Sequence, residues 1–79
     1  MPNIIVYSQP DCPPCKIVKM FLDEYKFPYI EKDIKADKNA REELTTKHGS
    51  YSTPTIVIDD EVIIGFDQER LQRALHISA

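Results

Sequence analysis

The sequence Asp11-Cys12-Pro13-Pro14-Cys15-Lys16 contains the two cysteines of the chain, spaced as Cys-x-x-Cys. It lies between a short apolar run, Ile4 to Tyr7, and a helical pattern that starts at Ile17. This position predicts a strand, a turn and a helix whose first turn carries both thiols. Amides at a helix N-terminus lack intrahelical partners and carry partial positive charge, so a sulfur there is stabilised as thiolate. The stretch therefore predicts a reactive thiol.

The prolines between the cysteines support this placement. With Cys12 as the N-cap, Pro13 and Pro14 take the first two helical positions, where an N–H would have no partner in any case. We expect the amides of Cys15 and Lys16 to face the Cys12 sulfur, and the Lys16 charge to lower the pKa of that thiol further. Pro13 stiffens the loop between the cysteines, which changes the reduction potential of the pair.

Length and composition define a small soluble protein. The 79 residues support one core, so residues 1–79 are predicted to form a single domain. No segment approaches the ~20 apolar residues of a membrane span, and a net charge of −3 without a basic stripe argues against nucleic acid. The start, Met1-Pro2-Asn3, lacks the features of a secretory signal, and the chain has few cysteines. Both observations favour a reducing cytoplasm.

The spacing of apolar and turn-forming residues predicts seven elements in the order βαβαββα. The strands are expected at Ile4–Tyr7, which is buried on both faces, and at Tyr29–Ile34, Thr55–Ile58 and Val62–Ile64. The helices are expected from Pro13 to about Tyr25, from an Asp37 cap to a left-handed Gly49, and after an Asp67 cap.

Each predicted helix has an apolar face. The face of the first helix is formed by Ile17, Val18, Phe21, Leu22 and Tyr25, and that of the last helix by Leu71, Ala74 and Leu75. The second helix has only Ala40 and Leu44, so we expect it to be the most exposed and least stable element. Lys19, His48 and His76 are predicted to be surface residues, the histidines near helix C-termini.

The last two strands form a predicted hairpin around Asp59-Asp60-Glu61. Aspartate tolerates the positive φ that a two-residue hairpin turn requires, but it does so less well than glycine. We therefore expect a turn longer than two residues.

Three motifs together identify a known family. Cys12-Pro13-Pro14-Cys15, Thr53-Pro54 before the hairpin and Ile64-Gly65-Phe66-Asp67 after it resemble the glutaredoxin family over essentially the whole chain. The resemblance implies a thioredoxin-like α/β fold, with a four-stranded mixed sheet flanked by three helices. It also implies a thiol-disulfide oxidoreductase in which Pro54 is cis and faces the cysteines, while Thr53 offers its backbone to an extended substrate.

The motif after the hairpin departs from the pattern of glutathione-using members. Those proteins typically carry a Gly-Gly pair followed two residues later by an acid, whereas this chain has Ile64-Gly65-Phe66-Asp67. Its Gly-Phe step is similar to that of redoxins that serve ribonucleotide reductase and are recharged by thioredoxin reductase. We therefore expect thioredoxin reductase as the electron donor, with glutathione as the alternative reductant and no tightly bound cofactor.

The same motif contributes to the predicted substrate site. Gly65 is expected to allow a tight turn, and Asp67 to cap a helix and to be available to a substrate's amino group. Phe66 and Tyr7 are more often core residues than substrate contacts, although Phe66 borders the predicted site.

Other uses of the cysteine pair are less favoured. A permanent disulfide closing so short a loop would stabilise little, and cytosolic disulfides are usually catalytic. A zinc site would need two more ligands, and His48 and His76 lack the usual spacing, so no metal site is expected. A [2Fe–2S] cluster held by Cys12 and external glutathione between two subunits occurs in related proteins and stays open as an alternative.

The sequence thus predicts a monomer that reduces protein disulfides by a dithiol mechanism. Cys12, exposed and ionised, attacks a substrate sulfur, and Cys15 resolves the mixed disulfide. The expected partners are a disulfide-containing protein and the electron donor.

Overall fold

The computed structural model describes residues 2–77 and contains one four-stranded sheet in the order β2-β1-β3-β4. Strand β1 (Ile4–Ser8) pairs in parallel with β2 (Ile30–Asp33) and antiparallel with β3 (Thr55–Ile58). Strand β4 (Glu61–Ile64) pairs antiparallel with β3 at the edge. The strand bounds differ from the predicted ones by no more than one residue at an end, and the mixed sheet is confirmed.

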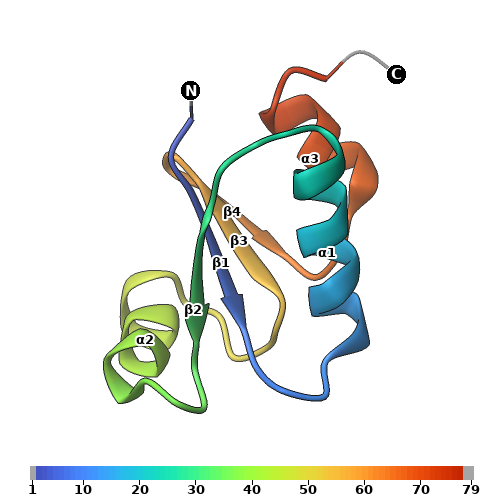
Figure 1. Cartoon of the computed structure of the whole chain (residues 1–79). Helices are drawn as coiled ribbons and strands as arrows, with labels where there is room; N and C mark the ends of the chain where they lie inside the picture. Colours follow the sequence, from blue (N-terminus) through green and yellow to red (C-terminus); the bar gives the residue numbers. More distant parts are fainter. Residues whose placement is uncertain (1, 78–79) are drawn as a thin grey trace.

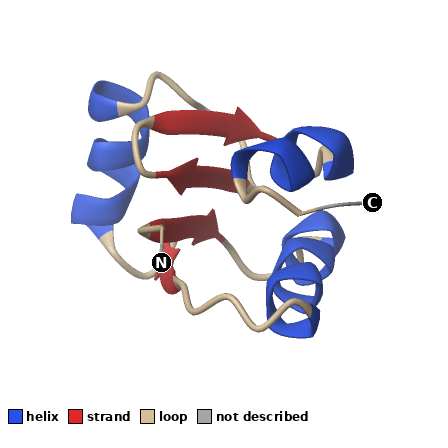
Figure 2. Ribbon diagram, turned by 90° about the horizontal axis from the view of Figure 1, so that it is seen from above, coloured by secondary structure: helices blue, strands red, loops and turns tan. Residues whose placement is uncertain are grey.

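Helices cover both faces of the sheet (Figures 1 and 2). Helices α1 (Pro13–Glu24) and α3 (Gln68–Ala74) lie on one face. Helix α2 (Lys38–Glu42) continues as the π-helical turn η1 (Glu43–Lys47) on the other. The predicted order βαβαββα and the thioredoxin-like fold are therefore confirmed. Within residues 2–77, none of the helices has the length and apolar character needed to cross a membrane.

Alternation along the strands divides the core into two clusters, because successive side chains of a strand point to opposite faces. The cluster under α1 and α3 comprises Ile4, Val6, Val18, Phe21, Leu22, Ile56, Ile58, Ile63, Leu71 and Leu75. The cluster under α2 comprises Tyr7, Ala40, Leu44 and Val57. Strand β1 contributes to both clusters, which confirms that it is buried on both faces.

The apolar face predicted for α1 is partly wrong. Val18, Phe21 and Leu22 are buried, whereas Ile17 is exposed and Tyr25, the C-cap, is also exposed. Successive residues are offset by about 100° around a helix, so a core centred between Val18 and Leu22 leaves Ile17 on the outer side.

The second helix is as thinly buried as predicted but not as regular. Only Ala40 is buried in α2, and Leu44 is buried in η1. The hydroxyls of Thr45 and Thr46 donate to the backbone carbonyl of Glu42 at 3.1 and 2.6 Å. Such bonds compete with the α-helical ladder, and here they accompany the change to a π-helical turn.

The hairpin turn is shorter than expected. Ile58 pairs with Glu61, so only Asp59 and Asp60 form the turn. Asp59 adopts φ 53°, and its carboxylate accepts a hydrogen bond from the Asn3 amide at 3.1 Å. This bond to the start of β1 supports a conformation that aspartate alone tolerates less well than glycine.

A polar cluster lies under η1, around the buried Tyr7. The Tyr7 hydroxyl donates to the Glu43 carboxylate, and Lys32 forms an ion pair with the same carboxylate at 2.7 Å. Burial and the Glu43 contact raise the pKa of Tyr7, while Lys32 and then Tyr7 lower the pKa of Glu43. The prediction for His48 is partly wrong: it lies at the C-cap of η1 as expected, but it is half-buried, with its ring 5.5 Å from the Tyr7 ring and its Nε2 buried. His76 is exposed as predicted.

Candidate active site

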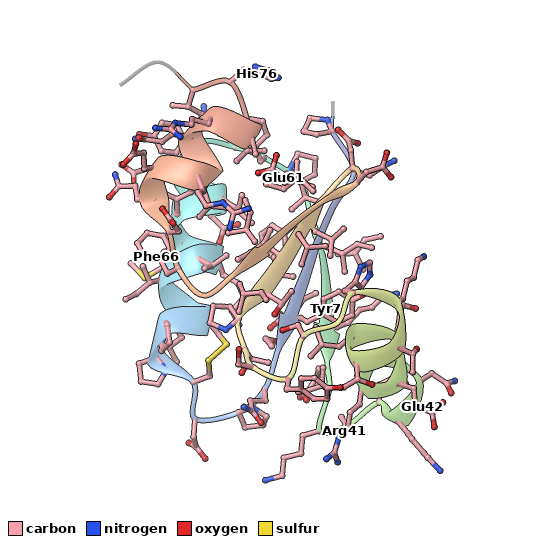
Figure 3. All side chains as sticks on the ribbon, turned by 180° about the vertical axis from the view of Figure 1, so that it is seen from behind. Tyr7, Arg41, Glu42, Glu61, Phe66 and His76 are labelled. Carbon is pink, nitrogen blue, oxygen red and sulfur yellow. A yellow bond between two sulfur atoms is a disulfide. The ribbon has the colours of Figure 1, made fainter. Side chains whose placement is uncertain are left out.

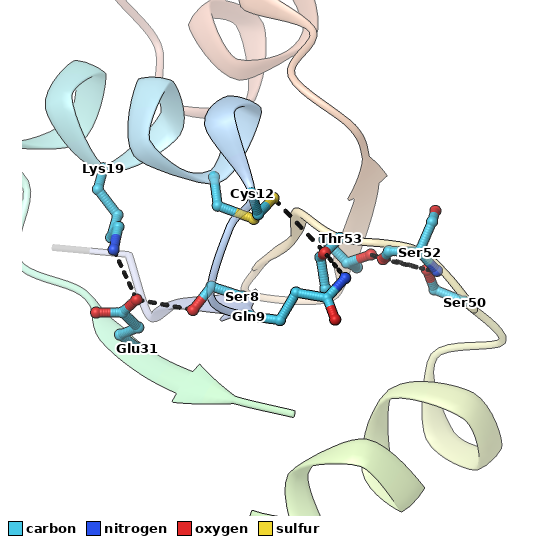
Figure 4. Close-up of a disulfide and its surroundings, with 10 residues drawn as sticks. Ser8, Gln9, Cys12, Lys19, Glu31, Ser50, Ser52 and Thr53 are labelled. Carbon is cyan, nitrogen blue, oxygen red and sulfur yellow. Dashed lines mark hydrogen bonds and ion pairs between the residues drawn. A yellow bond between two sulfur atoms is a disulfide. The ribbon is translucent and has the colours of Figure 1, made fainter. Parts of the chain in front are cut away.

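The two cysteines form a disulfide at the start of α1 (Figure 4). The Cα atoms of Cys12 and Cys15 are 5.3 Å apart. Cys12 is the N-cap in extended conformation, and Pro13 and Pro14 occupy the first two helical positions, as predicted. The turn therefore brings both sulfurs to the positive end of the helix dipole.

The prediction for the amides at this end is wrong in the oxidised state. The amides of Cys15 and Lys16 donate to the Cys12 carbonyl oxygen, at 3.1 and 3.3 Å, and not to its sulfur. The reason is that an N-cap residue already offers its carbonyl to the first turn of the helix. Stabilisation of a Cys12 thiolate by this helix would thus come from the dipole of the whole first turn.

The expectation that Cys12 is exposed is also wrong for this state. Cys12 is 8% exposed and Cys15 only 2%. The Cys12 sulfur is covered by its bond to Cys15 and by the Thr53 hydroxyl, which lies 3.6 Å away. Cys12 nevertheless lines two surface hollows of about 230 and 330 Å³, whereas Cys15 lines only the smaller. Cys12 is the more exposed residue of the pair.

The loop before β3 reaches the disulfide through Thr53. The Thr53–Pro54 peptide bond is cis, as the family resemblance implied. The Thr53 hydroxyl donates toward the Cys12 sulfur and accepts a hydrogen bond from the Gln9 side chain at 2.9 Å. Sequence patterns alone do not single out Gln9, because its hydrogen bond depends on the contact between these two loops.

The motif after the hairpin is tied to the same loop. Gly65 adopts φ 82°, and its amide donates to the Pro54 carbonyl at 2.8 Å. Asp67 caps α3 by accepting from the Arg70 amide at 3.1 Å, which confirms the predicted cap. Phe66, labelled in Figure 3, is half-buried. Its ring packs edge-on against Phe21 of α1, as expected of a residue that is partly core.

The smaller hollow beside the disulfide is polar and is lined by Lys16, Lys19, Ser8 and Glu31 among others. The Glu31 carboxylate accepts hydrogen bonds from Lys19 at 2.8 Å and from the buried Ser8 hydroxyl at 2.7 Å (Figure 4). Lys19, followed by Ser8, lowers the pKa of Glu31. Lys19 is thus paired with Glu31, while Lys16 lines both hollows beside Cys12.

The comparison with known families agrees with this geometry. The family model described as glutaredoxin matches residues 4–63. The chain belongs to the glutaredoxin family.

Individual proteins extend the likeness to nearly the whole chain. A glutaredoxin-like 8.6 kDa protein of the rubredoxin operon of Clostridium pasteurianum is 29% identical over 72 residues, covering 91% of this chain and 96% of that protein. A mutant of a thioredoxin-like protein, known from its crystal structure, is 54% identical in sequence to this chain. The two structures superpose with a TM-score of 0.93, and the match covers 99% of this chain and 100% of the mutant's chain. The NrdH-redoxin of Escherichia coli is 23% identical, with a TM-score of 0.84. The match covers 98% of this chain and 99% of the redoxin, and it shows that the two share a fold.

Proposed function

We propose that this glutaredoxin-family protein reduces disulfides of protein substrates by a dithiol mechanism through Cys12 and Cys15. The observation that carries the proposal is the Cys12–Cys15 disulfide at the N-terminus of α1, with the Thr53 hydroxyl beside the Cys12 sulfur. The reduced dithiol carries the two electrons that the reaction transfers, and closure of this bond releases them to the substrate disulfide. Thr53, Pro54 and the Gly65–Asp67 segment are the proposed substrate-binding residues.

In the proposed cycle, the Cys12 thiolate attacks one sulfur of the substrate disulfide. A bond forms between these two sulfurs, the substrate disulfide breaks, and the leaving thiolate takes up a proton. Cys15 then loses its proton and attacks the Cys12 sulfur, which releases the second substrate thiol. The products are a reduced substrate and the Cys12–Cys15 disulfide.

Reduction of the Cys12–Cys15 disulfide back to two thiols requires two electrons and two protons. We propose that thioredoxin reductase is the electron donor. The support comes from Ile64-Gly65-Phe66-Asp67, in which Phe66 follows the single glycine and Asp67 already caps α3 with its carboxylate. We propose a monomer that acts in the cytoplasm without a tightly bound cofactor. Glutathione is the alternative donor.

An NADPH-coupled assay tests the proposal, with insulin as the disulfide substrate. One reaction contains thioredoxin reductase, and a parallel one contains glutathione and glutathione reductase. We expect NADPH oxidation with thioredoxin reductase that depends on the protein and disappears in Cys12→Ser. Turnover with the glutathione pair alone would overturn the choice of donor, and absence of turnover with both pairs would overturn the function.

A further inference from the structure

Helix α1 carries an apolar stripe on the side that faces solvent. Ile17 is 47% exposed and Met20 is 69% exposed, and Pro13 is also exposed. At about 100° per residue, these three side chains fall within an arc of about 60°, on the side opposite Leu22 and Cys15. The outer face of a helix in a globular protein is normally polar, so core packing does not explain this stripe.

The stripe begins at the disulfide. Pro13 directly follows Cys12, and a rise of about 1.5 Å per residue puts Met20 roughly 12 Å along the helix from Cys12. The smaller hollow beside Cys12 differs in character, since Glu31 and Asp33 line it and Pro13 does not. Cys12 therefore lies between this polar hollow and the apolar stripe, with Asp11 and Lys16 beside Pro13.

The reach of the stripe from Cys12 distinguishes between classes of partner. A standard protein interface covers about 800 Å² on each partner, which corresponds to a disc of roughly 16 Å radius. A folded protein whose sulfur bonds to Cys12 would therefore also cover Ile17 and Met20. A small thiol bound at Cys12 would leave most of the stripe in water.

We propose that the stripe of Pro13, Ile17 and Met20 is the docking surface for a folded protein that exchanges electrons with Cys12. The partner's reactive sulfur would be bordered by apolar side chains, which bury the stripe when the sulfurs meet. This inference rests on the proposed function and adds which surface beside Cys12 the protein partner covers.

The test compares the double variant Ile17→Ser/Met20→Ser with wild type. Ile30→Ser is the matched control, because Ile30 is 61% exposed on the edge strand β2 and lies outside the stripe. Thioredoxin reductase and insulin are the protein probes, and bis(2-hydroxyethyl) disulfide is the small probe. Circular dichroism verifies that each variant folds.

We expect the double variant to lose about tenfold in kcat/KM with at least one protein probe, as for truncation of central interface residues. Its rate with the small disulfide should stay within about twofold of wild type, and Ile30→Ser should retain all rates. Unchanged rates with both protein probes would overturn the docking surface, as would an equal loss with the small disulfide.

Two further outcomes would also overturn it. A wild-type dimer in sedimentation that the double variant loses would assign the stripe to a second copy of the chain. Docking would be refuted, and the thiol chemistry left intact, if the wild-type protein reacted with the small disulfide but with neither protein probe. If it failed to react with the small disulfide, the proposed function itself would be refuted.

Discussion

Removal of the Glu43 carboxylate tests the polar cluster beneath η1. The Tyr7 hydroxyl is buried and donates to this carboxylate, which also pairs with Lys32 at 2.7 Å. A buried hydroxyl that loses its acceptor costs about 1–3 kcal/mol. The partly exposed Lys32 pair adds less than about 1 kcal/mol. Glu43→Ala should therefore destabilise the protein by about 1–4 kcal/mol.

The effect should depend on pH in a defined direction. Lys32 and Tyr7 hold the pKa of Glu43 below its ordinary value. A carboxyl of this kind stabilises the fold above its unfolded pKa, about 4.3, and loses that contribution as pH falls through the lower folded pKa. The difference in stability between wild type and Glu43→Gln should thus be complete above about pH 5 and shrink as the pH falls below about 4.

Urea unfolding of the oxidised protein, followed by circular dichroism, measures these changes. The control is Glu42→Ala, because Glu42 is an exposed neighbour (Figure 3) and should change stability by less than about 0.5 kcal/mol. Tyr7→Phe combined with Glu43→Ala should cost about 1 kcal/mol less than the sum of the single changes. Additive changes, or a Glu43→Ala variant as stable as the control, would refute the reasoning.

Three other changes test the site. Thr53→Val removes the hydroxyl beside the Cys12 sulfur and should raise the pKa of the reduced Cys12 thiol by roughly half a unit or more. The rate of iodoacetamide alkylation across pH measures this pKa, and an unchanged value would contradict the prediction. Asp67→Ala should cost about 1 kcal/mol in urea unfolding through loss of the α3 cap, whereas Asp67→Asn should cost little; equal losses would refute the cap. Gly65→Ala should cost about 1 kcal/mol or more, because φ is 82° there, and a neutral effect would contradict the strain.

The parts of the fold that depend on local spacing could be predicted from the sequence. Cys12 at the N-cap and the prolines after it follow from the preferences of a helix start. The continuous apolar run of β1 similarly indicates burial on both faces. The resemblance to a family, and not local spacing, supplied the cis bond before Pro54.

Features that depend on contacts between distant segments could not be predicted in this way. The bond from Ser8 to Glu31 requires the parallel register in which Ser8 pairs with Asp33. The burial of Cys12 in the oxidised state depends on how the Thr53 loop packs against it. The half-burial of His48 accompanies the contact of its ring with Tyr7, which the helical pattern around it does not encode.

Intact-protein mass spectrometry of the cysteine variants tests the central claim most directly, namely that Cys12 attacks and Cys15 resolves. Reduced Cys15→Ser and Cys12→Ser are each exposed to bis(2-hydroxyethyl) disulfide. We predict that Cys15→Ser rapidly gains one stable mercaptoethanol adduct, that Cys12→Ser gains it far more slowly, and that wild type closes its own disulfide without retaining an adduct. Faster adduct formation in Cys12→Ser than in Cys15→Ser would contradict this account.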